Sequence, residues 1–320
     1  AGEDKDSKYE AGSYLLTDTE KDMLDKVSGT FDKVVVVLNV PAVMDMNWMN
    51  DYPVDSVLYV WQGGMSGGDG AADVLTGDVN PSGRLTDTIA KEYSDYPSSS
   101  HFGRTDYNYY VEDIYVGYRY FETFAPDRVA YPFGYGLSYT TFDTSTYSVT
   151  ETDDSINVFT TVENTGDVAG KETVQVYFGA PQGELGRPAK ELVAFAKTKL
   201  LEPGESQDIT LTFKKEDMKT YDDSGATRHD SAYVMEAGDY KIYVGNDVRD
   251  SELEYVYRQP ELKVVEQLSE EMAPVKNFQR MKPEADEEGN LTVGYEDVPT
   301  QTVDVPAKIA ENQPEELTAK

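Results

Sequence analysis

The sequence predicts an α/β plus all-β fold: an α/β domain with a mostly parallel sheet, then a β-sandwich, then an extended acidic linker. Two observations support this. Short, continuously apolar β-branched runs occur before residue 131, and strict two-residue alternation begins after residue 141. With 320 residues, 39 % of them apolar, the chain is long enough for two domains. We therefore divide it into an α/β domain at 1–130, a junction at 131–141, a β-sandwich at 142–265 and a linker at 266–320.

The first elements are a helix and two buried strands. Thr17-Asp-Thr-Glu20 has the spacing of a capping box and precedes an amphipathic pattern, which predicts a helix from about 18 to 29. Lys33–Leu38 and Ser56–Trp61 are runs typical of strands buried on both faces of a parallel sheet. Ala42–Asp51, between them, has room for a short helix. These segments predict a right-handed strand, helix, strand unit.

Glycines follow the second strand, in Gln62–Gly70, and precede a helical pattern at Ala71–Leu75. A phosphate-binding loop would end in Gly-Lys-Ser/Thr, and a dinucleotide fingerprint would have a fixed glycine spacing. Neither occurs, so the stretch is interpreted as a strand-to-helix turn. The tyrosine-rich segment Lys91–Thr123 is expected to be a long surface excursion.

The junction reads Tyr-Pro-Phe-Gly-Tyr-Gly-Leu-Ser-Tyr-Thr-Thr from Tyr131 to Thr141. Its proline and glycines exclude a regular helix or a central strand. A packed joint between domains is the favoured interpretation, and an aromatic platform that stacks on a sugar is the alternative.

Beyond the junction, apolar residues alternate in four segments, and turn residues separate them. The alternating segments are 156–162, 174–178, 209–213 and 240–244. About seven short strands over this length predict an immunoglobulin-like or fibronectin type III-like sandwich. Residues 266–320 are acidic and contain prolines, which indicates a linker that wraps a neighbour.

Composition excludes several classes of function. The 60 acidic and 28 basic side chains give a net charge of −32, which repels nucleic acid and anionic membranes. The absence of cysteine removes disulfides and thiolate catalysis, but leaves a cytoplasmic or secreted location open. The longest strongly apolar run, Val34–Val43, is too short to span a bilayer. We expect a soluble protein whose substrate is neutral or cationic.

Few other side chains suggest chemistry. His101 and His229 are far apart in sequence and fall in different domains, so neither a metal site nor a Ser/His/Asp triad is expected, and no cofactor is expected. Trp61 ends a predicted buried strand and is assigned to the core. Trp48 can belong either to the core or to a sugar-binding surface.

Several short segments follow one another in a particular order along residues 1 to about 265. They are Val34–Leu38, Trp61-Gln-Gly-Gly, Ala72–Leu85, Val116-Gly-Tyr-Arg-Tyr120, Pro132–Thr140, Asn164-Thr-Gly166, Gly170–Tyr177 and Leu201-Glu-Pro-Gly204. Together they resemble glycoside hydrolase family 3, the β-glucosidase family. The resemblance implies an α/β sandwich whose first part is missing, then a fibronectin type III domain. It also implies a (β/α)8 barrel with a nucleophilic aspartate.

The barrel and its nucleophile are expected on a separate segment or chain. No Ser-Asp-Trp of the kind that carries the nucleophile occurs in the sequence. The tail from Gln267 resembles the connector of family members in which the barrel comes last, so we expect the barrel after residue 320.

The resemblance also implies a general acid/base. Gly2-Glu3-Asp-Lys-Asp-Ser7 is similar to the family's Gly-Glu-Gly-x-Asp-Arg, in which the glutamate donates the proton, and Glu3 is therefore the candidate. Asp4 replaces a glycine of the motif and Ser7 replaces an arginine. Neighbouring carboxylates are expected to raise the pKa of Glu3 in the assembled enzyme.

The implied activity is hydrolysis of terminal β-D-glucosides or cello-oligosaccharides with retention of configuration. A β-xylosidase or another exo-β-glycosidase of the family is the alternative, and a non-catalytic fibronectin-like binding module is a further one. The substrate-binding residues, the sugar linkage and the oligomeric state, including a homo-oligomer, stay open.

Overall fold

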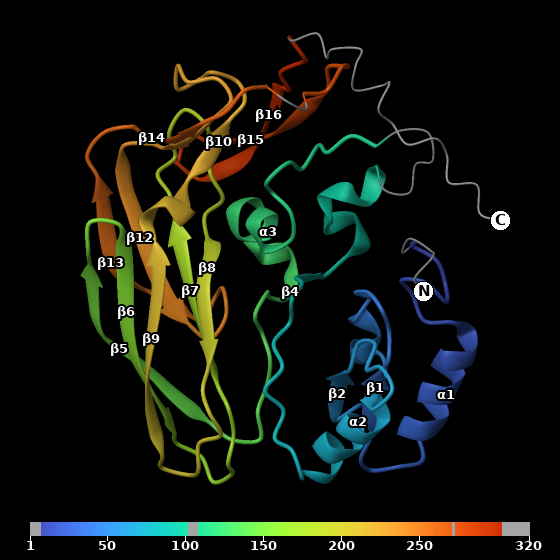
Figure 1. Ribbon diagram of the computed structural model, residues 1–320. Helices are drawn as coiled ribbons and strands as arrows, with labels where there is room; N and C mark the ends of the chain where they lie inside the picture. Colours follow the sequence, from blue (N-terminus) through green and yellow to red (C-terminus); the bar gives the residue numbers. More distant parts are fainter. Residues whose placement is uncertain (1–7, 102–107, 271–272, 303–320) are drawn as a thin grey trace, which may run out of the picture.

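The computed structural model describes residues 8–101, 108–270 and 273–302. The helices and the parallel strands lie on one side, the β-sandwich lies on the other, and a late hairpin lies across one end (Figure 1). Among the described residues, no helix is both long enough and apolar enough to cross a membrane.

The α/β part begins as the sequence predicts. Helix α1 (Asp18–Ser28) follows Thr17, whose backbone N–H donates to the Glu20 carboxylate at 2.7 Å while its hydroxyl oxygen accepts from the Glu20 N–H at 3.2 Å. Strands β1 (Val35–Leu38) and β2 (Ser56–Tyr59) pair in parallel, and helix α2 (Gly67–Thr76) follows the glycine-rich turn. Between the strands, where a short helix is predicted, the chain makes one 3₁₀ turn, η1 (Asn47–Asn50).

Only one face of β1 is covered, which corrects the prediction that both are. Leu38 joins a core cluster, whereas Val35 and Val37 remain 49 % and 41 % exposed. The cluster consists of Leu16, Leu24, Leu38, Met44, Met46, Trp48 and Ile89. Parallel sheets are stable when layers cover both faces. In the described residues this sheet has two strands, and the layer over Val35 and Val37 is not among them.

One short pair of strands flanks the tyrosine-rich excursion, with one strand before it and one after it. β3 (Ile89–Ala90) pairs with β4 (Val129–Tyr131). Between them lie two 3₁₀ turns, η2 (Tyr93–Asp95) and η3 (Pro97–Ser100), and a short helix, α3 (Tyr118–Phe124), followed by a further 3₁₀ turn, η4 (Pro126–Arg128). Phe121 of α3 is fully buried with Ala90 and Val129, so the excursion has a core of its own.

The junction is a packed joint. The rings of Phe133 and Tyr118 stack at 4.5 Å, and Tyr118 also meets the sandwich residue Tyr177 edge-on at 6.1 Å. The Asn80 side chain accepts from Tyr139 N–H at 2.8 Å and donates to the Ala169 carbonyl at 3.1 Å. These contacts connect the α/β part to the sandwich.

The sandwich has the predicted seven strands in two antiparallel sheets. One sheet has the order β5-β6-β9 and the other β13-β12-β7-β8. The strands are β5 (Phe142–Glu151), β6 (Ser155–Asn164), β7 (Thr173–Gly179), β8 (Glu191–Lys197), β9 (Ser206–Lys214), β12 (Gly238–Gly245) and β13 (Ser251–Gln259). A small third sheet orders β10 (Thr220–Asp222), β11 (Ala232–Met235) and β14 (Lys263–Gln267), and the 3₁₀ turn η5 (Lys215–Met218) precedes β10.

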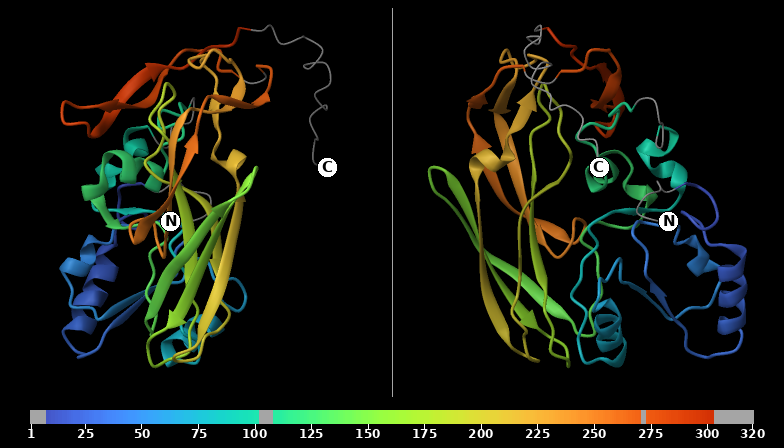
Figure 2. Two further views of the ribbon diagram at one scale, coloured as in Figure 1. Left: turned by 90° about the vertical axis from the view of Figure 1, so that its left-hand side faces the viewer. Right: turned by 45° about the vertical axis from the view of Figure 1, so that its right-hand side comes forward.

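A hairpin occupies part of the segment for which the sequence predicts an extended linker. β15 (Gln279–Ala285) and β16 (Leu291–Asp297) pair over their full lengths, and the hairpin lies over helix α3, beside the end of the sandwich (Figure 2). Arg280 of β15 pairs with Asp223 at 2.7 Å, Glu296 at 2.8 Å and Asp113 at 3.4 Å. Arg280 therefore joins the hairpin to carboxylates of two earlier segments, a feature that composition alone does not reveal.

Candidate functional site

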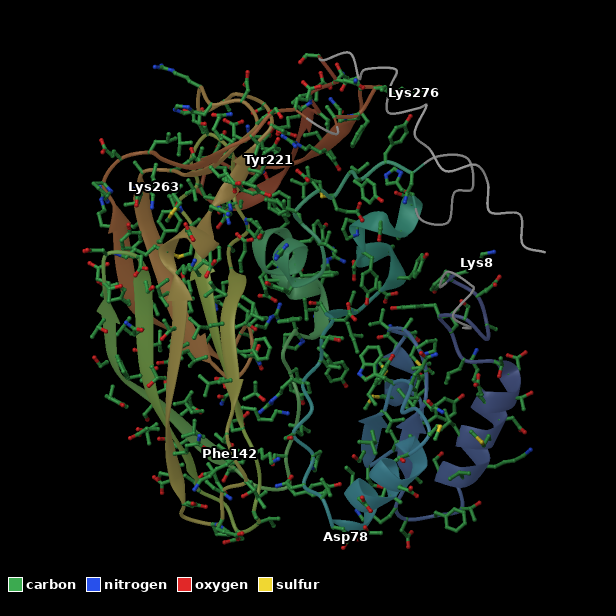
Figure 3. All side chains as sticks on the ribbon, viewed as in Figure 1. Lys8, Asp78, Phe142, Tyr221, Lys263 and Lys276 are labelled. Atoms are coloured by element: carbon green, nitrogen blue, oxygen red, sulfur yellow. The ribbon has the colours of Figure 1, made fainter. Side chains whose placement is uncertain are left out.

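Glu3, the acid/base that the family resemblance implies, lies outside the described residues. The described chain starts at Lys8, on the outer side of the α/β part and far from Phe142 in the sandwich (Figure 3). We call residues 8–15, the first residues that the structure describes, the anchor loop. Lys8 N–H donates to Ser13 Oγ at 2.8 Å, and Lys8 carbonyl accepts from Tyr14 N–H at 3.1 Å. Both backbone groups of Lys8, five residues after Glu3, are thus held by the same loop.

The anchor loop rests on a group of aromatic rings. Tyr14 is 2 % exposed, and its ring meets those of Tyr93 at 5.1 Å and Tyr96 at 6.4 Å. Tyr96 in turn packs edge-on against Phe121 at 5.6 Å. Tyr9, 60 % exposed, covers Tyr93 at 5.3 Å. The excursion therefore supports the start of the chain through edge-to-face contacts.

This support lies beside the carboxyl ends of the parallel strands. Tyr14 carbonyl accepts from the N–H of Asp45, in the segment that follows β1. Tyr59, the last residue of β2, donates its hydroxyl to the Ala42 carbonyl at 2.6 Å. Open α/β sheets bind ligands outside the carboxyl ends of their strands. The anchor loop is bonded to the segment that follows β1.

The electrostatics around the aromatic rings disfavour negative charge. Burial, followed by the neighbouring groups Tyr96, Asp45 and Glu92, raises the pKa of the Tyr14 hydroxyl. Burial likewise raises the pKa of Tyr59 and of Tyr96. These hydroxyls therefore remain protonated at neutral pH.

The two tryptophans occupy different environments. Trp48 is buried in the core beneath the sheet, which removes it from the sugar-binding candidates. Trp61 lies just beyond β2 and is only half-buried, outside the core cluster, which corrects its assignment to the core. Its ring meets that of Tyr59 at 4.5 Å, and its φ of +53° is rare outside glycine. Non-glycine residues with such dihedrals concentrate at functional sites. The turn after Trp61 is tight, since a Cβ on Gly63 would lie 2.6 Å from the Cα of Gly67.

The remaining polar candidates do not converge. His101 lies after η3 and His229 lies in a loop of the sandwich part, as the sequence predicts. Among residues 8–101, 108–270 and 273–302, no three His, Asp or Glu side chains are grouped as metal ligands.

The sequence patterns did not identify the anchor loop. They drew attention to the acidic residues near Glu3, whereas the structure shows Ser13 and Tyr14 bonded to Lys8 within residues 8–15. The signal in the sequence that could have indicated this contact is the density of tyrosine in two segments. The anchor loop contains Tyr9 and Tyr14, and the excursion contains Tyr93 and Tyr96.

Two families of domains match this chain. Residues 1–139 match the glycosyl hydrolase family 3 C-terminal domain, and residues 172–248 match a fibronectin type III-like domain.

Relatives extend the similarity along nearly the whole chain. A β-glucosidase of Ruminococcus albus is 49 % identical over 308 residues, which is 96 % of this chain and 32 % of the relative. The crystal structure of a β-glucosidase from Paenibacillus barengoltzii is 50 % identical, with a TM-score of 0.91 over 98 % of this chain and 36 % of that one. β-Glucosidase 3B from Thermotoga neapolitana, solved in complex with glucose, is 41 % identical with a TM-score of 0.74, over 82 % and 36 %. The chain thus spans about a third of the length of these proteins.

Proposed function

Because the chain contains the C-terminal domain of glycosyl hydrolase family 3 together with a fibronectin type III-like domain, we propose that it is the acid/base-bearing part of a retaining β-glucosidase. The substrate is a terminal β-D-glucoside, such as the non-reducing end of a cello-oligosaccharide. The observation that carries the proposal is the similarity over 98 % of the chain to a β-glucosidase of known structure.

Retaining hydrolysis requires two carboxyl groups about 5 to 5.5 Å apart, one that attacks the anomeric carbon and one that protonates the leaving oxygen. We assign the second role to Glu3. We expect the acidic residues close to Glu3 in sequence, such as Glu10, to raise the pKa of Glu3, because like charges disfavour the ionised carboxylate. The net charge of −32 suits a neutral sugar.

The nucleophile belongs, in this proposal, to a companion (β/α)8 barrel outside these 320 residues. The chain spans about a third of its relatives, which leaves room for such a segment. The uncovered valines of β1, Val35 and Val37, support a further covering layer on the sheet. Catalysis then needs both parts, and the isolated chain is inactive.

The test is Glu3→Ala in the complete enzyme. Hydrolysis of substrates with poor leaving groups, such as cellobiose, should fall by about 10²-fold or more, because the general acid is lost. Activated aryl β-glucosides should still form the glycosyl-enzyme, because their leaving groups need little protonation. Asp32→Ala, which removes an exposed carboxylate of the same domain, is the control and should change neither rate.

Equal loss on both substrates in the Glu3 variant would overturn the proton-donor assignment. Preference for an aryl β-xyloside over the glucoside would favour the β-xylosidase alternative. Absence of hydrolysis in the complete wild-type protein, with sugar binding by residues 142–265 alone, would favour a non-catalytic module.

A further inference from the structure

We propose that the outer face of the sheet β5-β6-β9 binds a β-glucan chain, with Tyr147 and Phe159 as the platform on which sugar rings stack. The two rings come from neighbouring strands, and their centroids lie 6.2 Å apart. Tyr147 is 60 % exposed. For the class of glycan, the inference rests on the proposed function; for the site, it rests on the residues of this sheet.

A β-bulge presents Tyr147 on this face. Thr146 of β5 lies opposite Thr160, and Ser148 lies opposite Phe159. Tyr147 is therefore the extra residue of the bulge, and bulges turn a side chain away from its regular direction. The sheet thus carries two aromatic rings side by side on its solvent-facing side.

The outer face of this sheet points away from the α/β part. The other sheet of the sandwich lies between them, because Tyr177 of β7 meets Tyr118 of helix α3. Strands β5 and β6 lie on the side of the sandwich that is far from the helices (Figure 1). Thr210 and Thr212 of β9 are exposed on the same face. The described residues therefore leave it open to a long ligand.

The middle of this face is nearly free of charged side chains. Residues 145–150 of β5, 157–161 of β6 and 208–212 of β9 contain one charged residue, Asp208, in a chain in which 28 % of residues are charged. The fold does not impose this composition, because strand β13 of the other sheet carries three charged side chains in nine residues. An uncharged face suits a neutral ligand, whereas the net charge of −32 repels a polyanion.

Two rows of polar side chains flank the rings. The rows are Ser145, Thr161 and Asp208, and Thr150, Asn157 and Thr212. Thr161 donates to the Asp208 carboxylate at 2.6 Å, which holds both side chains in place. Thr212 donates to the side-chain oxygen of Asn157 at 2.8 Å. Four residues of β6 separate the rows, or about 13 Å along the strand. This span is longer than one sugar ring, so the ligand is an oligosaccharide or a polymer.

A glucan fits this chemistry better than a protein partner does. Sugar rings stack their C–H faces on aromatic rings, and the hydroxyls at their edges bond to side-chain hydroxyls, amides and carboxylates. The centres of protein interfaces are instead rich in apolar side chains and poor in serine. A second copy of this chain would also bring the same net charge of −32.

The test is native electrophoresis of the complete enzyme in gels with and without a soluble mixed-linkage β-glucan. The glucan should retard the wild type, and Tyr147→Ser with Phe159→Thr should weaken binding by about 10-fold or more. Tyr147→Ser alone replaces an exposed side chain, so it tests the inference if the double variant fails to fold. Tyr147→Phe keeps the ring and should bind as the wild type does. The kcat/KM for 4-nitrophenyl β-glucoside should stay unchanged in each variant.

Tyr221→Ser is the matched control. Tyr221 is 40 % exposed, and its ring meets that of Tyr233 at 5.2 Å, but this pair has a charged neighbour, because Lys219 lies 4.6 Å from the centre of the Tyr233 ring. Retardation by the glucan should be the same as in the wild type.

No retardation of the wild type, or an equal loss in Tyr221→Ser, would overturn the inference. So would a fall in molecular mass by light scattering in Tyr147→Ser, because the face would then join two copies of the chain. Failure of the proposed function is distinct, because it would appear as no hydrolysis of the aryl β-glucoside by a wild type that the glucan still retards.

Discussion

Gly134 lies so close to Gln175 that a Cβ on the glycine would be 2.6 Å from the side-chain oxygen of Gln175. The glycine also has φ = +84°. One residue of the junction is thus fixed both by its backbone conformation and by its contact with strand β7 of the sandwich.

Replacing Gly134 by alanine should destabilise the protein through both effects. Gly77 has a similar φ of +82°, but nothing lies within 4 Å of its Cβ position, so Gly77→Ala measures the backbone effect alone. We expect about 1 kcal/mol for Gly77→Ala and about 2 to 4 kcal/mol for Gly134→Ala. Urea unfolding measures both. Equal losses of unfolding free energy in the two variants would show that the junction shifts to accommodate the added methyl group.

The ion pair of Arg84 and Glu172 joins the α/β part to the sandwich in a buried setting. Arg84 also donates to the carbonyl of Gly136 in the junction. Arg84→Met leaves a buried carboxylate without its cation and should lower the free energy of unfolding by about 3 kcal/mol or more. Arg84→Met with Glu172→Met should be less destabilised than the single change, and thermal unfolding compares them. A double variant that loses as much stability as Arg84→Met and Glu172→Met lose together would contradict this expectation. Lys33→Met, which breaks an exposed pair, is the control and should have little effect.

Asp222 should make the stability of the sandwich depend on pH. Burial alone would raise the pKa of its carboxyl, but hydrogen bonds from Thr227 and Ser224 favour the charged form and hold the pKa below its ordinary value of 3.8. Its contribution to stability is present above this ordinary value and is lost as pH falls through the lower, folded value. Asp222→Asn should therefore cost about 1 to 3 kcal/mol at neutral pH, and less as the pH falls below 4. Unfolding curves from pH 2 to 7 measure the difference, and a constant difference would refute the prediction.

Arg280 should hold the late hairpin on the molecule. It is mostly buried and pairs with Asp113, Asp223 and Glu296, so Arg280→Gln removes one cation from three carboxylates. We expect faster hydrogen exchange in β15 and β16, with the core strands of the sandwich unchanged. Arg258→Gln removes an exposed arginine with a single partner, Asp239, and should leave exchange in the hairpin as it is. Exchange that rises equally in both variants would argue against a specific role of Arg280.

Local sequence patterns predicted the regular elements. The capping box at Thr17 starts α1, the β-branched runs pair in parallel, and the alternating segments form the sandwich. These features depend on neighbouring residues, whose periodicity and turn chemistry are visible in the sequence. The ordered segments also indicated the family, and hence Glu3 as the candidate acid/base.

Contacts between distant residues were decided only by the tertiary structure. Whether a valine of β1 is covered, whether Trp48 faces a sugar or the core, and which carboxylates pair with Arg280 all depend on segments far away in sequence. Tyr14 is the clearest case: it resembles any other tyrosine until the excursion brings Tyr93 and Tyr96 beneath it. The sequence by itself determined the order of the elements and the family. The fold decided how the anchor loop packs on the rings of Tyr93 and Tyr96, because packing energy arises from atoms in contact and not from neighbours in sequence.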